Sequence, residues 1–290
     1  MRSGRLKGLN PIPKTRSIVF YLSVRGRRIL IDLHCHILAH VDDGPGNIEE
    51  SLTIAEVAAA DGIRTIVATP HSQNGVYDNP PAEIAKHVTR LKQEIKRERI
   101  PINICPGAEV RIHQGMEHSL QKARIASINE TGHYILVEFP HDVILPGTRD
   151  ALFQLSINHI TPILAHPERN MALQRKPDVL AGLVDMGCLV QVTAMSITGE
   201  LGKDAMDYAH LLLREGQAHV IASDAHDTEN RPPLLTPAVK EAARILGDLG
   251  AAEAMVTKNP RAILDGKQLN LPEPGKVVKK KSWWGRWLGL

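Results

Sequence analysis

The sequence has few cysteines, no long apolar run and little excess of either charge. Its three cysteines, Cys35, Cys105 and Cys188, are an odd number spread along 290 residues, which excludes a disulfide framework and favours the reducing cytoplasm. No apolar stretch approaches the roughly 20 residues that a membrane-spanning helix needs, and the early run at 18–24 is too short for a secretory signal. The net charge of only +3 argues against nucleic acid as a partner.

What the sequence does contain is an ordinary globular mixture, 43% hydrophobic and 23% charged. Apolar, β-branched runs predict strands at 29–33, 63–69, 102–105, 134–139, 161–165, 188–193 and 218–223. Amphipathic stretches predict helices at 47–61, 80–97, 149–158, 177–186, 203–214 and 237–249, the first of them capped by Asn47 and Glu50. Strand and helix alternate about seven times, which predicts a parallel α/β fold, either a barrel or an open sheet.

The two ends differ from the middle, so we divide the chain into an extension at 1–28, one α/β domain at 29–266 and a tail at 267–290. The tail carries Lys279, Lys280 and Lys281 and all three tryptophans of the protein. Basic residues and tryptophans suit an anionic membrane interface, so a weak membrane-surface contact is one interpretation of the tail. A solvated tail, or one that docks on a partner or a second subunit, is the other.

Two histidines at the end of the first predicted strand form a candidate metal half-site. Side chains alternate along a strand, so His34 and His36 share a face while Cys35 points away. Taken alone, such a pair is as readily structural as metal-binding.

The ends of the other predicted strands strengthen the metal interpretation. Six of the seven strands finish at or just before a histidine or an acid, and the further candidates are His71, Glu109, Glu138, His166, Asp224 and His226. Such residues are costly at the end of a buried strand unless they are paired or metal-bound, and the carboxyl edge is where α/β folds build their sites. Imidazoles and carboxylates without thiolates favour a catalytic cluster of Mn²⁺, Fe, Zn²⁺ or Mg²⁺.

Three further residues extend the candidate site. Asp43, within Asp42-Asp43-Gly44, could supply an oxygen ligand, although this triplet also suits a simple turn. Arg169 and Arg231 follow candidate ligands in the chain and could bind a phosphate in bidentate fashion, although either arginine alone could form a surface salt bridge.

Taken in order, these motifs resemble one known superfamily. The segments that carry the resemblance are His34-Cys35-His36, Asp42-Asp43-Gly44, Thr69-Pro70-His71, Gly107-Ala108-Glu109, Val137-Glu138-Phe139, His166-Pro167-Glu168-Arg169 and Ser223-Asp224-Ala225-His226. Together they resemble the PHP (polymerase and histidinol phosphatase) superfamily. Within it they are similar to the bacterial manganese-dependent protein-tyrosine phosphatases of the CpsB/YwqE type, from capsule and exopolysaccharide operons, over residues 29–266.

The resemblance implies a distorted (β/α)₇ barrel with three metal ions, expected to be Mn²⁺, at the carboxyl rim of the strands. By position, His34, His36, Glu109 and Asp224 would hold the first ion. Glu109, Glu138 and His166 would hold the second, and Asp43, His71 and His226 the third. The catalytic residues would be Arg169, Arg231 and Asp43.

The implied reaction is hydrolysis of phosphotyrosine on the tail of a bacterial tyrosine-autokinase that regulates polysaccharide synthesis, by direct attack of a metal-activated water. Cys105 and Arg111 have Cys-x₅-Arg spacing, but the implied reaction uses a metal-activated water, so a cysteine nucleophile is not expected. The protein would be cytoplasmic or peripheral at the inner face of the membrane, and the Glu49-Glu50-Ser51 segment allows for a homo-oligomer.

Two alternatives remain open at this stage. One is another PHP phosphoesterase, such as a histidinol-phosphatase or a small-molecule phosphatase, because a fold does not fix a substrate. The other is a non-catalytic module that binds phosphotyrosine or membranes. The extension at 1–28 and the Lys/Trp tail depart from the family pattern without affecting the ligand set.

Overall fold

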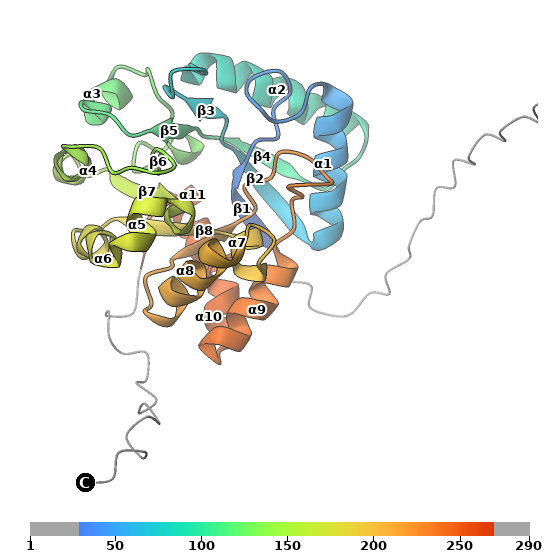
Figure 1. The fold of residues 1–290 in the computed structure, drawn as a ribbon. Coiled ribbons are helices and arrows are strands. Elements are labelled where there is room, and N and C mark those ends of the chain that lie inside the picture. Colours follow the sequence, from blue (N-terminus) through green and yellow to red (C-terminus); the bar gives the residue numbers. More distant parts are fainter. Residues whose placement is uncertain (1–28, 270–290) are drawn as a thin grey trace, which may run out of the picture.

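Parallel strands line the centre of the molecule and helices surround them, as Figure 1 shows for the computed structural model, which describes residues 29–269. The strands are β1 Leu30–Cys35, β2 Ile63–Ala68, β3 His71–Ser72, β4 Asn103–Pro106, β5 Glu109–Arg111, β6 Tyr134–Glu138, β7 Thr161–Ala165, β8 Leu189–Thr193 and β9 Val220–Ala222. The α-helices are α1 Ile48–Asp61, α2 Pro81–Arg97, α3 Met116–Gln121, α4 Thr148–Ile157, α5 Met171–Arg175, α6 Pro177–Asp185, α7 Ala194–Thr198, α8 Lys203–Arg214, α9 Thr236–Leu246, α10 Leu249–Ala254 and α11 Lys258–Leu264. Two 3₁₀ turns, η1 Ile128–Glu130 and η2 Pro167–Arg169, complete the described elements.

The strands form two parallel sheets, ordered β1-β2-β4 and β3-β5-β6-β7-β8-β9. Two residues separate β2 from β3 and two separate β4 from β5, so each pair is one interrupted strand position. Beyond β9 the chain returns to β1, because the amide of Asp224 donates to the carbonyl of His34 at 2.8 Å and Cys35 bridges Ala225. The sheets therefore make a distorted ring of seven strand positions, which confirms the expected α/β barrel.

All seven predicted strands are present, with bounds shifted by one or two residues, but the two interruptions were not predicted. Pro70 lacks an amide hydrogen, so the ladder cannot continue through it. At Gly107 a Cβ atom would lie 2.7 Å from Cγ1 of Val67, so only glycine permits this close approach of neighbouring strands. The breaks turn β3 and β5, with His71 and Glu109 at their starts, toward the carboxyl end of the ring.

The longer predicted helices are also present, and the shortest ones were missed. Asn47 caps α1 as expected, its side chain accepting from the amide of Glu50, and Gly62 ends the helix with φ of 104°. The predicted helix at 237–249 is α9 and ends earlier than expected, at Leu246, because Gly247 terminates it in the left-handed region. Helices α3, α5, α7, α10 and α11 have five to seven residues, too few to show a 3.6-residue period.

Apolar side chains fill the ring as well as the layer between strands and helices. A cluster separate from the main core joins Ile31, Leu136 and Ile163 of the strands to Ile263 and Leu264 of α11. The interior is thus a packed core, and most of the buried histidines and acids gather where the strands end. None of the helices within 29–269 combines the length and apolar character that crossing a membrane requires. Residues 1–28 and 270–290, including the tryptophans of the predicted membrane contact, lie outside the described part.

Candidate metal and phosphate site

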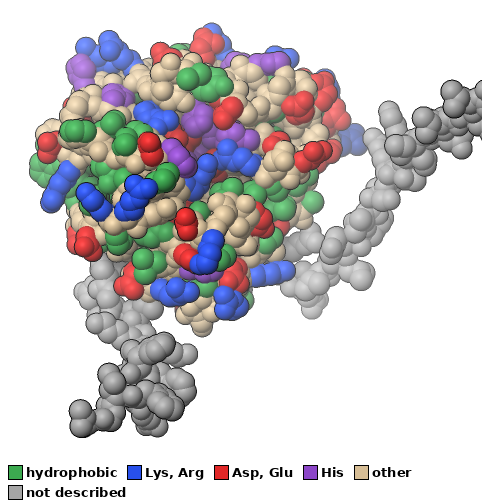
Figure 2. Space-filling view, in the orientation of Figure 1, with side chains coloured by type: hydrophobic (Ala, Val, Ile, Leu, Met, Phe, Trp, Pro, Cys, Tyr) green, Lys and Arg blue, Asp and Glu red, His purple; other side chains and the backbone are tan. Residues whose placement is uncertain are grey.

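The predicted ligands meet at the carboxyl ends of the strands. They come from β1 and the loop after it, from β3, β5 and β6, and from the segments after β7 and β9: His34, His36, Asp43, His71, Glu109, Glu138, His166, Asp224 and His226. They fall into groups of three or four whose ligand atoms lie within 4.8 Å of one another, and shared members link the groups. Figure 2 shows histidines gathered near the middle of this face, with basic side chains beside them.

Four buried side chains make the tightest part of the cluster: His34, His36, Glu109 and Asp224. The two Nε2 atoms of His34 and His36 are 3.2 Å apart. Oε2 of Glu109 lies 3.5 Å from Nε2 of His34 and 3.4 Å from Nε2 of His36. Oδ1 of Asp224 lies 3.3 Å and 3.5 Å from the same two nitrogens. Ligands about 2.1 Å from one tetrahedral ion lie about 3.4 Å from one another. Each of the two oxygens therefore lies from the two imidazole nitrogens at the spacing of ligands around a single divalent ion.

Glu109 connects this group to a second one. Its other oxygen, Oε1, lies 2.7 Å from Nε2 of His166, so the two oxygens of one carboxylate face two different histidine sets. Glu138 approaches from the opposite side, with Oε2 at 3.9 Å from Nδ1 of His71, and groups with His71 and Glu109 rather than with His166. The guanidinium of Arg111 holds the same Glu138 oxygen at 3.0 Å. The carboxylate of Glu109, which is shared between these groups, is suited to bridge two ions.

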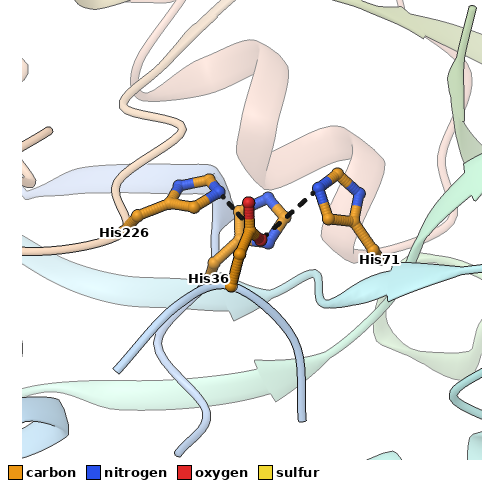
Figure 3. Close-up of side chains that lie close together, drawn as sticks. His36, His71 and His226 are labelled. Atoms are coloured by element: carbon orange, nitrogen blue, oxygen red, sulfur yellow. Dashed lines mark ion pairs between the residues drawn. The ribbon is translucent and has the colours of Figure 1, made fainter. Parts of the chain in front are cut away.

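A third group consists of His36, Asp43, His71 and His226, whose three imidazoles are labelled in Figure 3. Oδ1 of Asp43 lies 3.3 Å from Nε2 of His226 and 3.5 Å from Nε2 of His71. The hydrogen bond to His226, only partly offset by burial, lowers the pKa of Asp43. Asp43 is half exposed whereas His36 is fully buried, so this group lies at the solvent side of the cluster.

Buried acceptors fix which nitrogen of each histidine faces the cluster. Nδ1 of His36 lies 2.7 Å from Oδ2 of Asp42, and Nδ1 of His34 lies 2.9 Å from Oε1 of Gln191. Because these oxygens only accept, both Nδ1 atoms carry hydrogen, and both Nε2 lone pairs point inward. Asp42, one of the two acids considered as an oxygen ligand, thus orients a histidine instead. Gln191 was missed, because a glutamine inside an apolar strand gives no metal signal.

The donor set fits divalent ions. Three of its atoms, Nδ1 of His71, Oε2 of Glu109 and Oε2 of Glu138, are buried and lack a well-aligned hydrogen bond among the described residues, although Nδ1 of His71 lies 2.9 Å from that Glu109 oxygen and Arg111 forms an ion pair with the Glu138 oxygen. Burial, then the neighbouring charge of Glu109, raises the pKa of Glu138 to about 7. Burial also acts to raise the pKa of Glu109, but His34 and His166 bring it well below its usual value. Closely packed acids and inward-facing lone pairs need positive charge between them, and nitrogen with oxygen donors suits Mn²⁺, Fe or Zn²⁺.

Two arginines converge on one oxygen at the edge of this cluster. Nη1 of Arg169 donates to Oδ2 of Asp224 at 2.6 Å, and Nη2 of Arg231 donates to the same oxygen. The other oxygen of Asp224 belongs to the tight group of four. Both arginine side chains are about one quarter exposed, at 27% and 25%, so an anion from solvent can reach them. Arg111, a third arginine at the site, was not predicted.

A buried carboxyl anchors the turn that carries His166 and Arg169. Glu168 is fully buried, and its Oε1 accepts from the amide of Thr193 at 3.0 Å and from the hydroxyl of Ser196 at 2.7 Å. Burial raises the pKa of Glu168 to about 7. Its role was not predicted, although it lies within the quoted His-Pro-Glu-Arg motif. Because His166 has φ of 32°, the turn needs such external support.

Asp32 serves a similar purpose at the junction of the first and last strands. Its carboxylate accepts from the amides of His34, at 3.3 Å, and Ser223, at 3.0 Å. This buried link fixes the end of β1, which carries two histidines, against the segment that carries Asp224. This link was not predicted, because Asp32 and Ser223 lie 191 positions apart.

The three cysteines take no part in the cluster. All are buried, and burial raises the pKa of each thiol, to about 12 for Cys188. Thiols of this kind are poor nucleophiles at neutral pH.

The fold and the site together define an α/β barrel protein whose carboxyl rim carries a cluster of potential metal ligands beside two partly exposed arginines. A family model for "Capsular polysaccharide synthesis, CpsB/CapC" matches residues 30–265. The chain belongs to this CpsB/CapC family.

Named relatives agree with the family. The tyrosine-protein phosphatase YwqE of Bacillus subtilis is 35% identical over 254 residues, covering 87% of this chain and 98% of YwqE. The putative tyrosine-protein phosphatase CapC of Staphylococcus aureus is 32% identical, covering 88% of this chain and 99% of CapC. The tyrosine-protein phosphatase CpsB of Streptococcus pneumoniae is 32% identical, covering 81% of this chain and 98% of CpsB.

Solved structures agree with the fold. One from the pair YwqE of Bacillus subtilis and CpsB of Streptococcus pneumoniae, described as metal-dependent tyrosine phosphatases, matches with a TM-score of 0.81 at 35% identity, covering 84% of this chain and 98% of that one. The lactonase Lmo2620 of Listeria monocytogenes, 14% identical with a TM-score of 0.50 and covering 83% of this chain and 95% of that one, shares the fold alone.

Proposed function

We propose that this protein is a divalent-metal-dependent phosphatase that hydrolyses phosphotyrosine on a protein substrate. The observation that carries the proposal is the double role of Asp224. One of its oxygens lies among the four closely spaced ligand atoms, and the other receives both arginines. A phosphate ester placed there would meet cations on one side and guanidinium groups on the other.

The proposed ligand sets follow the family pattern, with Mn²⁺ in three sites. His34, His36, Glu109 and Asp224 would hold one ion, Glu109, Glu138 and His166 a second, and Asp43, His71 and His226 a third. The spacing of the first set supports this assignment most directly. Bound ions of this kind would supply the Lewis acidity that activates water and withdraws charge from the phosphoryl group.

The chain's own residues would bind and orient the ester. Arg169 and Arg231 would exchange their shared contact with Asp224 for the oxygens of the phosphate, where forked N–H donors offset the charge of the equatorial oxygens. Glu168 would keep Arg169 in place through its bonds to Thr193 and Ser196. The buried thiols stay outside the reaction, so we propose no covalent phosphoenzyme.

The protein substrate we propose is the tyrosine-phosphorylated tail of a bacterial tyrosine kinase that controls capsule or exopolysaccharide synthesis. The names of the family and of its relatives support this context. We propose a cytoplasmic location, with a weak membrane-surface contact through residues 276–290 and a homo-oligomer as further expectations. Flotation with anionic liposomes, with and without residues 276–290, tests the membrane contact, and equal partitioning would end that idea.

The decisive experiment is metal analysis combined with phosphatase assays of the wild type and of Arg169→Ala. A phosphotyrosine peptide and histidinol phosphate are assayed in parallel to separate the proposal from other phosphoesterases of this fold. We expect metal-bound protein, turnover of the peptide, and a loss of at least about 100-fold in kcat/KM for the variant. Faster turnover of histidinol phosphate, or an unchanged rate in a metal-loaded Arg169→Ala protein, would refute the proposal as stated.

A further inference from the structure

An apolar groove lies on the same face of the barrel as the metal and phosphate site. It has a volume of about 480 Å³ and is lined by Ile144, Leu145, Val179 and Leu183, with Arg149 and Asp178 at its edges. These residues belong to the loop after β6, to the first turn of α4 and to the first two turns of α6. In a βα barrel these loops and turns lie at the carboxyl ends of the strands, where Glu138 and His166 are also found.

Exposed apolar side chains are concentrated around this groove. Of the ten large apolar side chains exposed within 29–269, four belong to the loop after β6 or to α5 and α6: Val143, Leu145, Met171 and Val179. Their exposed fractions run from 37% to 42%. Figure 1 shows α4, α5 and α6 side by side along one side of the ring. Two of them, Leu145 and Val179, line the groove itself, and exposed apolar side chains grouped in this way on a globular protein often mark an interaction site.

The groove is physically joined to the phosphate site. Asn170 follows Arg169 directly, and its side-chain amide donates to the carbonyls of Pro140 at 2.6 Å and Val143 at 3.3 Å. The amide of Met171 donates to the carbonyl of His141 at 3.1 Å. The loop that carries the groove is therefore fixed to the turn that carries the phosphate-binding arginine. A small cleft lined by Glu138, Phe139, His166, Arg169 and Asn170 lies against the same turn.

Resting on the proposed function, we propose that this groove binds apolar or aromatic side chains that flank the phosphotyrosine in the substrate polypeptide. A phosphorylated polypeptide whose phosphate binds Arg169 would lie across the loop at 140–147, because that loop borders the turn that carries Arg169. The edges of the groove carry charges of both signs, Arg149 with Asp150 and Asp178, so the groove offers apolar contact rather than selection by charge. It would make the enzyme selective for polypeptides over small phosphate esters.

The test uses the full-length, metal-loaded protein and the double variant Leu145→Ser/Val179→Ser. Three substrates are compared: a phosphotyrosine peptide with leucine and phenylalanine beside the phosphotyrosine, the same peptide with serine at those positions, and p-nitrophenyl phosphate. The matched control is Phe153→Ser/Ile157→Ser, which removes two apolar side chains of similar exposure from α4 that do not line the groove.

We expect the groove variant to raise KM for the apolar peptide about tenfold. It should leave the serine peptide and p-nitrophenyl phosphate unchanged, and the control variant should resemble the wild type on all three substrates. Equal KM values for the two peptides in the wild type, or an equal effect of both double variants, would overturn the inference.

Evidence for either of two other occupants of the groove would also overturn the inference. If the groove variant converts a dimer to a monomer in sedimentation, the occupant is a second copy of the chain. If the variant changes the peptide KM only while residues 270–290 are present, the occupant is the chain's own C-terminal segment. A wild type that hydrolyses p-nitrophenyl phosphate and both peptides without preference refutes this inference alone, whereas one that hydrolyses no phosphotyrosine refutes the proposed function.

Discussion

Nδ1 of His36 lies 2.7 Å from Oδ2 of Asp42, and this contact sets the direction of the Nε2 lone pair toward the ligand cluster. Asp42 also accepts from the amide of Gly44 at 3.0 Å and from that of His71 at 3.0 Å, so one carboxylate organises both the histidine and the loop beside it. The hydrogen bond to His36, against the opposing effect of burial, lowers the pKa of Asp42, which therefore stays ionised at neutral pH.

The first prediction concerns this carboxylate. Asp42→Asn removes the charge that orients His36, and outer contacts of this kind are worth about 10–100-fold in metal affinity. We expect a loss of that size for Mn²⁺, measured by titration calorimetry and by metal content after dialysis. The matched control is Asp265→Asn, an acid whose only described ion pair is with exposed Lys267. Equal metal affinity in the two variants would contradict the orienting role.

The second prediction concerns the close approach at Gly44. A Cβ atom there would lie 2.3 Å from the carbonyl oxygen of His36, so Gly44→Ala must displace the loop that carries Asp42 and Asp43. We expect reduced metal content and at least about a tenfold loss of activity, since small displacements of positioned groups are costly. Gly46→Ala is the control, because its nearest contact would be Oε2 of Glu50 at 3.6 Å. Wild-type metal content in Gly44→Ala would count against a rigid loop.

The third prediction concerns the cysteines. Replacement of Cys35, Cys105 and Cys188 by alanine should leave kcat within about threefold, because buried thiols with raised pKa values are weak nucleophiles. Stability should fall by about 1 kcal/mol or more for each buried sulfur removed. Urea unfolding measures the stability. The kcat of the wild type after treatment with iodoacetamide, which alkylates thiols, provides a second test of whether the cysteines take part in the reaction. A folded, metal-loaded triple variant without activity would refute the proposed chemistry.

The fourth prediction concerns pH and His219, which lies away from the ligand cluster. Burial lowers the pKa of His219 from 6.5 to about 4, and its Nδ1 accepts from the amide of Val190 at 2.9 Å. The unfolded chain binds a proton near pH 6.5 while the folded chain does not, so stability falls as the pH drops from about 6.5 to about 4. This shift corresponds to about 3 kcal/mol.

The variant His219→Asn isolates that contribution. Asparagine can offer Oδ1 to the amide of Val190 but does not titrate. Between pH 6.5 and 4 the unfolding free energy of the variant should therefore fall by less than that of the wild type. Urea unfolding at several pH values measures the difference between the two proteins. Parallel pH profiles for wild type and variant would show that His219 is not the group responsible.

Most of the ring was predictable because each strand position carries its own signal. Runs such as Thr161–Ala165 are apolar after their first residue, which indicates burial on both faces, and Asn47 and Gly62 mark the two ends of α1 by local backbone chemistry. The short strands β3 and β5 were not predictable, because their pairing depends on a proline and on a close approach at Gly107 that only the neighbouring strand reveals.

The sequence by itself determined the seven strand positions, the candidate ligands at their ends and the family to which the chain belongs, because these depend on residue type and local periodicity. The tertiary structure alone decided which atoms of those ligands face one another and that both arginines share one oxygen of Asp224. It also showed that Asp42 and Gln191 orient the histidines. The physical reason is that such contacts join residues as distant in the chain as His34 and Asp224, at separations of about 3 Å that depend on how the ring closes.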